Sequence, residues 1–429
     1  MENSVKNLIQ FIDHSPSCFH VIENAKKQFL EHGFIQLEEK EHWNLEEGKS
    51  YFVERNGSSI LAFHLPKKDF QGFHIVASHS DSPTYRIKEQ PEMSVEKHYT
   101  KLNIERYGGM IPETWFDRPL SVAGRIIIEE NGQIKDQLVN IDRDLMIIPN
   151  LAIHMSRSSN ESKQLNPQKD LLPLCGGNLT KDGFEEMIAK ESGVEKEDIL
   201  SYDLFLYNRM RGTTLGINEE FVAAPKLDDL ECAYSSIEGM LNAKLSKDYV
   251  TVCAVFDNEE VGSGTKQGAG STFFPEVLKR ISYLCGKNEE EYYMAVADSF
   301  MLSADNAHAV HPNYQDKTDP TNRPYINEGI VLKYNASQKY TTDANSAALV
   351  KYLCKKEKIK CQVFFNRSDM LGGSTLGNIL IGQVSIKAAD IGLPQLSMHS
   401  TYETAGCKDL DDMITLMGSF YELGKEVQI

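Results

Sequence analysis

The sequence predicts an α/β protein in which one α/β domain is interrupted by a β-rich insertion. Strand-like apolar runs alternate with helix-like segments towards both ends of the 429-residue chain. Between them, from about Gln90 to Phe221, short β-like runs alternate with polar loops. The length also suggests two or three domains. We therefore expect a first domain made of residues 1–89 and 223–429, and an inserted second domain made of residues 90–222.

The elements expected in the first half of the chain come from apolar spacing and its interruptions. Apolar residues at helical spacing predict helical structure from Ser4 to Glu31, broken near Ser15-Pro16. The apolar run Phe73–Ala77 predicts a buried strand, because polar residues follow it at once. Within the expected insertion, the predictions are β-like runs at Gly124–Ile128 and Leu145–Ile148 and a polar loop at Arg157–Asp170.

After Pro225 the chain returns to a pattern in which helices and strands alternate. A helix is expected from Leu230 to Leu245, followed by a strand from Val250 to Phe256. Further elements are expected as strands at Tyr293–Ala297 and Cys361–Phe365 and as a last helix at Lys408–Val427.

Composition and charge exclude several classes of function. Asp and Glu total 62 against 45 Lys and Arg, which gives a net charge of −17. Such a chain repels phosphate backbones and anionic lipid surfaces, so we expect neither a nucleic-acid nor a membrane partner. No apolar run approaches the ~20 residues that cross a bilayer. The N-terminus lacks the layout of a signal peptide and the eight cysteines are scattered singly, so we expect a cytoplasmic protein.

Polar clusters directly follow several apolar runs, at the positions where open α/β sheets carry their sites. Together they supply two histidines and several carboxylates from distant parts of the chain. That mixture suits zinc, cobalt or manganese better than a thiolate-rich structural site. The clusters are His79-Ser80-Asp81, Asp257-Asn258-Glu259-Glu260, Asp298 with Ser303-Ala304-Asp305, Met398-His399-Ser400, and Asp228-Asp229 at the start of a helix.

Each cluster alone also fits an ordinary structural role, such as a hydrogen-bonded histidine, a helix N-cap or a solvated loop. Their combination favours chemistry, because Asp81 can orient the imidazole of His79. Of two adjacent glutamates, one can bind metal while the other handles a proton. The glycine-rich stretch Gly262–Gly268 resembles a dinucleotide fingerprint, but its spacing is wrong and it follows acidic residues. We interpret it as a tight turn that seats Glu259 and Glu260.

Ordered sequence blocks then identify a family. The blocks are Ser15–His20 with Gly33-Phe34, Ser78–Pro83, Thr114–Leu120, Leu151–Met155, Ala224–Leu230, Asp257–Ser263, Ser303–Asn313 and Pro394–Ser400. On these blocks the sequence resembles, nearly end to end, the aspartyl aminopeptidase family of dinuclear zinc metallopeptidases, in its bacterial form. The resemblance implies a mixed-sheet α/β/α metallopeptidase domain interrupted by a β-rich dimerisation domain.

The resemblance also implies a role for each residue of the site. It assigns two divalent metal ions to each subunit, zinc first, with cobalt or manganese as alternatives. Small departures lie beside the bridging position, with Asp229 where relatives often carry Asn and Lys226 where they carry Arg. The implied metal ligands are His79 and Asp305 on one ion, Glu260 and His399 on the other, and Asp228 between them. Asp81 would orient His79, and Glu259 would be the general base. The implied substrate contacts are His308, Lys333, Tyr340 and His154 of a neighbouring subunit, where His154 could instead approach the metal.

The implied function is metal-dependent removal of the first residue from short peptides, with a preference for Asp or Glu. The charge of −17 gives acidic peptides no long-range help, so Lys333 and His154 would have to supply the positive charge locally. The implied assembly is a homo-oligomer, a tetrahedral dodecamer built from dimers.

Three alternatives stay open at this point. They are a dinuclear aminopeptidase with neutral or broad preference, a related amidohydrolase, and a metal-stabilised scaffold without turnover. Glu259 argues against the scaffold, which has no use for an unligated base.

Overall fold

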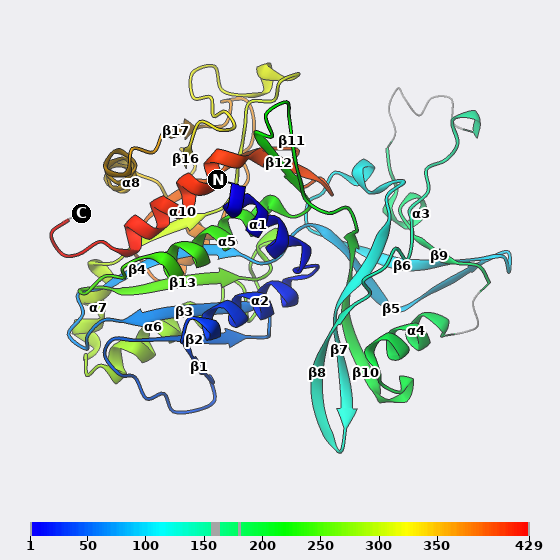
Figure 1. Cartoon of the computed structure of the whole chain (residues 1–429), viewed down its shortest axis with the longest axis horizontal. Coiled ribbons are helices and arrows are strands. Elements are labelled where there is room, and N and C mark those ends of the chain that lie inside the picture. Colours follow the sequence, from blue (N-terminus) through cyan, green and yellow to red (C-terminus); the bar gives the residue numbers. More distant parts are fainter. Residues whose placement is uncertain (1, 156–163, 179–181, 428–429) are drawn as a thin grey trace.

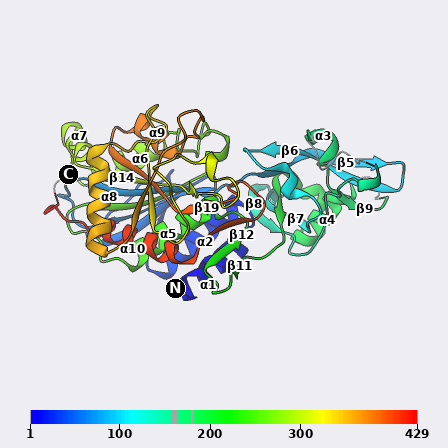
Figure 2. The same cartoon turned by 90° about the horizontal axis from the view of Figure 1, so that it is seen from above.

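The computed structural model describes residues 2–155, 164–178 and 182–427. It confirms the expected α/β fold, with three sheets of nine, six and five strands. Figure 1 shows the six-stranded sheet lying beside the nine-stranded sheet and its helices, and the view from above in Figure 2 agrees. No helix in the described ranges is long and apolar enough to span a membrane.

The nine-stranded sheet is the centre of the larger part of the molecule. Its middle strands β4 and β13 are fully buried, which explains why their sequences are mostly apolar. Parallel and antiparallel neighbours are mixed. In sheet order the strands are β1 (Ile35–Leu37), β2 (Lys49–Arg55), β3 (Ser59–Leu65), β13 (Val250–Phe256), β4 (Phe73–His79), β14 (Phe300–Ala304), β18 (Lys387–Gly392), β16 (Ile330–Lys333) and β17 (Cys361–Phe364).

Helices cover both faces of this sheet and form two separate apolar cores, which makes an α/β/α arrangement (Figure 2). Each helix contributes an apolar stripe to the face it covers. One face is covered by α1 (Glu2–Asp13), α2 (Cys18–Glu31), α5 (Leu227–Asn242), α8 (Ala344–Glu357) and α10 (Cys407–Tyr421), and the other by α6 (Phe273–Leu284), α7 (Glu289–Ala297) and α9 (Leu376–Gln383).

The six-stranded antiparallel sheet is built entirely between Thr84 and Asn208 and has its own apolar core. The predicted domain limits at residues 90 and 222 fall inside strands β5 and β12, and they stay a prediction. In sheet order the strands are β8 (Gln133–Asn140), β7 (Leu120–Glu130), β10 (Ile199–Asn208), β5 (Thr84–Val95), β6 (Tyr99–Tyr107) and β9 (Leu174–Gly176), accompanied by helices α3 (Pro167–Asp170) and α4 (Gly183–Ser192).

The five-stranded sheet joins the segment that leaves the six-stranded sheet to the C-terminal part of the chain. Its antiparallel pairing of β12 with β20 fixes the start of α5 against the last loops of the chain. The strands are β11 (Thr213–Leu215), β12 (Phe221–Ala224), β20 (Glu403–Gly406), β19 (Pro394–Leu396) and β15 (Ala307–His308).

Most expected elements match, and three expectations were wrong. The expected strand at Tyr293–Ala297 belongs to helix α7, because Asn288 and Glu291 form a capping box that starts a helix there. The run Leu145–Ile148 makes only isolated β-bridges. The last helix ends at Tyr421, not at Val427. The expected loop Arg157–Asp170 lies partly outside the described residues, and its end, Pro167–Asp170, forms α3.

Candidate active site

Polar residues from three distant segments meet at one edge of the nine-stranded sheet. Strand β4 lies between β13 and β14 and runs parallel to both, so the carboxyl ends of all three strands share this edge. His79 ends β4, Glu259 and Glu260 follow β13 in the short 3-10 helix η4 (Glu259–Val261), and Asp305 follows β14. The edge position explains why residues so far apart in sequence converge.

Four of the five predicted metal ligands lie within reach of one another. His79 Nε2 is 3.7 Å from Asp228 Oδ1, and His399 Nε2 is 3.3 Å from Asp228 Oδ2. His399 Nε2 is also 3.5 Å from Glu260 Oε1. The two oxygens of Asp228 therefore face two different histidines. Glu259 joins a group with His79 and Glu260 whose candidate ligand atoms lie within 4.8 Å of one another.

Asp305, the fifth predicted ligand, stands outside these groups of described residues. Its Oδ1 is 3.3 Å from Lys333 Nζ, which also donates hydrogen bonds to the backbone carbonyls of Asp305 and Asn306 at 2.6 and 3.1 Å. Burial raises the pKa of Asp305 and the Lys333 ammonium opposes that shift. Lys333 thus holds the whole Asp305 segment beside the site.

Buried carboxylate oxygens without a hydrogen-bond partner are the clearest sign of a cation site. Asp228 Oδ1, Asp229 Oδ1 and Glu260 Oε1 are buried and accept no hydrogen bond among the described residues. Burial raises the pKa of Glu260 far above its usual range, and Asp228 adds to the shift. Burial also acts on Asp228, but the neighbouring imidazoles of His399 and His79 lower its pKa. Buried anions of this density need cations, and oxygen with imidazole nitrogen suits zinc.

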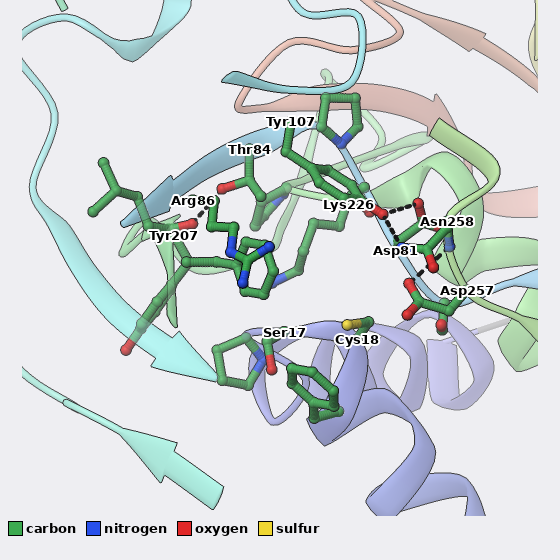
Figure 3. A pocket seen from close by; sticks show the side chains of 18 of the residues that line it. Ser17, Cys18, Asp81, Thr84, Arg86, Tyr107, Tyr207, Lys226, Asp257 and Asn258 are labelled. Atoms are coloured by element: carbon green, nitrogen blue, oxygen red, sulfur yellow. Dashed lines mark hydrogen bonds between the residues drawn. The ribbon is translucent and has the colours of Figure 1, made fainter. Parts of the chain in front are cut away.

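Asp81 is the centre of the hydrogen-bond network behind these ligands. Its carboxylate accepts the backbone N–H groups of Glu259 at 3.1 Å and Glu260 at 3.2 Å. His79 Nδ1 lies 3.3 Å from Asp81 Oδ1, so a proton on Nδ1 leaves Nε2 free as a ligand atom. The hydroxyl of Tyr107 donates to Asp81 Oδ2 at 2.7 Å (Figure 3). The orienting role of Asp81 stays a prediction, and these contacts are the ones that such a role requires.

Asp229 and Glu403 also hold ligand segments in place. Asp229 Oδ2 accepts the backbone N–H of His79 at 3.1 Å, a bond that an asparagine oxygen could make equally well. Glu403 accepts the backbone N–H of Asp228 at 2.9 Å and of His399 at 2.7 Å. Sequence reasoning missed Glu403, because only the structure shows that this glutamate is buried against the ligand segments.

The four predicted substrate residues do not all lie in one place. Lys333 and Tyr340 are buried together, with Lys333 Nζ 5.2 Å from the centre of the Tyr340 ring. His308 is exposed on β15, and its ring lies 6.1 Å from that of Phe364. His154 lies in an exposed 3-10 turn of the six-stranded domain, η2 (Ile153–Met155). No contact among the described residues joins His154 to the ligand group of its own subunit.

A cavity of about 250 Å³, whose lining includes the proposed ligand Asp228, lies behind Asp81, between α2, the six-stranded sheet and the start of α5 (Figure 3). Its lining includes Asp81, Tyr107 and Asn258, and the thiol-bearing residue Cys18. Asp257 also lines it, and burial raises the pKa of that carboxyl to about 7. His79, Glu260 and His399 are not part of the lining.

Comparisons with known proteins place the chain among known relatives. A family model described as aminopeptidase I zinc metalloprotease (M18) matches residues 11–421. A protein of Clostridium acetobutylicum named "Probable M18 family aminopeptidase 2" is 45% identical over 431 residues, covering 97% of this chain and 98% of the relative. A protein of the same name from Pseudomonas aeruginosa is 36% identical over 424 residues, covering 97% of both chains.

Solved structures show the same fold. The chain in a cryo-electron microscopy structure of an Ape4 and Nbr1 complex superposes with a TM-score of 0.95 at 36% identity, covering 98% of this chain and 85% of that one. The mApe1 dodecamer of S. cerevisiae gives a TM-score of 0.85 at 26% identity, covering 98% of this chain and 97% of that one.

Proposed function

The chain belongs to the M18 family of zinc aminopeptidases, and we propose that its site holds two divalent metal ions and prefers peptides that begin with Asp or Glu. The observation that carries the two-metal proposal is the geometry of Asp228. One of its oxygens faces His79 and the other faces His399, and the buried Oδ1 has no hydrogen-bond partner among the described residues. A carboxylate so placed suits a bridge between two cations.

The residues fit the proposed ions as follows. His79 and Asp305 would hold one ion, Glu260 and His399 would hold the other, and Asp228 would bridge them. Bound ions of this kind supply an activated water and Lewis acidity at the scissile carbonyl. The chain's own part is to hold these ligands, through Asp81, Asp229 and Glu403, and to move protons.

Glu259 is the proposed proton carrier. It lies beside Glu260 in η4, and the hydrogen bond from its backbone N–H to Asp81 fixes its position. Burial raises the pKa of its carboxyl to about 8, with His79 opposing the shift and Asp305 adding to it. A base so placed accepts the proton of the attacking water and returns it to the leaving amine nitrogen.

Selectivity for the N-terminal residue would have two sources. The surrounding carboxylates provide a negative environment for the free α-ammonium group of a peptide, which restricts cleavage to the first bond. For an acidic first side chain, Lys333 is the permanent cation among the four predicted substrate residues, and it lies against Asp305. The carboxylate of an acidic substrate side chain would form an ion pair with the Lys333 ammonium, in competition with Asp305.

A specific observation favours the alternative of neutral or broad preference. The Lys333 ammonium has three protons. It already has three acceptors, namely the carbonyls of Asp305 and Asn306 and the Asp305 carboxylate. An acidic substrate would have to displace one of them.

Rates on matched aspartyl, glutamyl and leucyl peptides test the preference directly. We expect the two acidic peptides to be cleaved faster, and Lys333→Met to lower the aspartyl-to-leucyl ratio of kcat/KM at least tenfold. Lys339→Met is the matched control, because it removes the same charge from an exposed position six residues away. Faster leucyl than aspartyl cleavage by the unmodified enzyme would establish the neutral preference instead.

We also propose a homo-oligomer, with a tetrahedral dodecamer built from dimers as its form. The dodecamer of the 26%-identical yeast relative supports it. So do the exposed apolar side chains around His154, because Leu151, Ile153 and Met155 expose 52%, 48% and 76% of their surface in the isolated chain. A cytoplasmic location is proposed as well, since all eight cysteines are free thiols.

A further inference from the structure

We infer that the six-stranded domain supplies part of the metal site of its own subunit, through the segment Tyr107–Ile111, and that Tyr107 is a positioning residue. This inference rests on the proposed metal site. None of the ligands predicted for that site comes from this domain, whose sheet is built from residues 84–208. The segment leaves the end of β6 and contacts the supports of both proposed ions.

The first contact acts on the His79 side of the site. The Tyr107 hydroxyl donates to Asp81 Oδ2 at 2.7 Å, and it accepts a hydrogen bond from Asn258 Nδ2 at 2.9 Å. Asp81 faces His79 Nδ1 and the backbone N–H groups of η4, so this phenol fixes the carboxylate that fixes the ligands. Burial, with Asp81 adding to it, raises the pKa of Tyr107 far above its usual range, so its proton stays available to donate.

The Tyr107 ring is itself held in place. It packs edge-on against Phe205 of β10, with ring centres 5.7 Å apart and planes at 76°. Figure 3 shows the Tyr107 side chain reaching Asp81 and Asn258 at one end of the cavity. The hydroxyl is therefore positioned by the six-stranded sheet, whereas Asp81 lies in the loop that follows β4.

The second contact acts on the other proposed ion. Gly108 has φ +78°, and a Cβ there would lie 3.1 Å from Glu260 Cβ. A Cβ on Gly109 would lie 3.7 Å from His399 Nδ1. Two residues further, the backbone N–H of Ile111 donates to the carbonyl of His399 at 3.1 Å. Glycine is needed at position 108 both for its conformation and for this close approach.

The consequence is that displacement of this segment disturbs ligands of both ions at once. Partners that orient metal ligands typically change metal affinity or activity by about 10- to 100-fold when they are removed. The segment thus couples the six-stranded domain to the metal centre within one subunit.

Tyr107→Phe tests the inference on the full-length, zinc-loaded enzyme, because it removes only the hydroxyl. We expect zinc affinity, measured by competition with a chelator, to fall about 10- to 100-fold. We expect kcat to fall with KM little changed, and the aspartyl-to-leucyl ratio to stay constant, because Tyr107 touches none of the predicted substrate residues. Tyr85→Phe is the control: Tyr85 is a buried tyrosine of the same sheet whose hydroxyl has no hydrogen-bond partner among the described residues.

A pair of glycine variants gives a second measurement that does not depend on Tyr107. Gly108→Ala and Gly132→Ala carry the same backbone strain, since φ is +78° and +76°, but a Cβ at position 132 meets nothing within 4 Å. Only Gly108→Ala should lose zinc affinity. Wild-type zinc affinity and kcat in Tyr107→Phe would overturn the inference. If Tyr107→Phe fails to fold, equal zinc affinities of Gly108→Ala and Gly132→Ala would overturn it. Zinc affinity is measured without substrate. The result can therefore be interpreted even if the proposed preference for acidic peptides is wrong.

Discussion

Single residues of the site divide into groups that hold metal and groups that hold those ligands. The carboxylates of Asp81, Asp229 and Glu403 accept hydrogen bonds from backbone N–H groups of the ligand segments. Among the described residues, Asp228 and Glu260 each have a buried oxygen without a hydrogen-bond partner, and so does Asp229, beside its bond to the His79 backbone. Substitution should therefore separate metal binding from turnover, because Glu259 belongs to neither group.

Glu259→Gln should keep both metals and lose turnover. The amide cannot accept the proton of the attacking water, so we expect kcat to fall about 10²- to 10⁴-fold while metal content per subunit stays unchanged. Metal analysis of the purified variant and steady-state kinetics provide the two measurements. Asp228→Ala is the contrasting variant, because it should lose metal and activity together. Near-normal turnover by a fully loaded Glu259→Gln enzyme would show that another group is the base.

Whole elements were predictable where one sequence signal dominated. Strands β4 and β13 were found because both faces are buried and polar residues follow at once. The same signal located most of the proposed ligands. Helix α7 did not follow from apolar spacing, because its apolar residues Tyr292, Ala295 and Val296 form a short run that also fits a strand. The capping box at its start is the signal that indicates a helix.

The supports of the site were less predictable. Tyr107 lies 26 positions after Asp81 and belongs to another sheet. No local sequence pattern therefore predicts the hydrogen bond between them. Only the folded arrangement of the two sheets brings the phenol to the carboxylate.

Strand β4 also carries a histidine whose burial makes stability depend on pH. His74 stacks on Tyr249 with ring centres 4.0 Å apart, packs near Phe420 of α10, and has a buried Nδ1 without a hydrogen-bond partner. Burial lowers the pKa of His74 to about 3. The ordinary pKa is about 6.5, so the unfolded chain binds this proton more readily than the folded one below that pH.

The free energy of unfolding should therefore fall as pH drops below about 6.5, by up to about 1.4 kcal/mol per pH unit from His74 alone. Urea unfolding at pH 7.5 and 5.5 measures the change. His74→Phe should make the difference between the two pH values smaller, whereas the exposed His42→Phe should leave it as in wild type. An unaltered difference in His74→Phe would show that this histidine does not drive the loss.

At the scale of the whole molecule, the proposed assembly gives His154 a role that one subunit cannot. His154→Ala should fold and bind metal but lose activity, if it completes the site of a neighbour. Mixing it with Glu259→Gln should restore part of the turnover, because a hybrid site can pair an intact Glu259 with a neighbour's intact His154. Kinetics of the exchanged mixture check this, with subunit exchange verified by mass spectrometry.

Two controls bound that experiment. The separate variants, incubated alone, set the background activity. Exchanged hybrids no more active than this background would show that His154 serves its own subunit or no site at all.

The cavity behind Asp81 opens a route to inhibitors that differs from chelation. Compounds that bind zinc directly share their warhead with inhibitors of many unrelated metalloenzymes. A molecule filling this cavity would instead contact Asp81, Tyr107 and Asn258, beside the half-buried side chain of Cys18. Its selectivity would then come from the junction of helix α2 with two sheets, and it would act on the residues that hold the metal ligands without binding the metal itself.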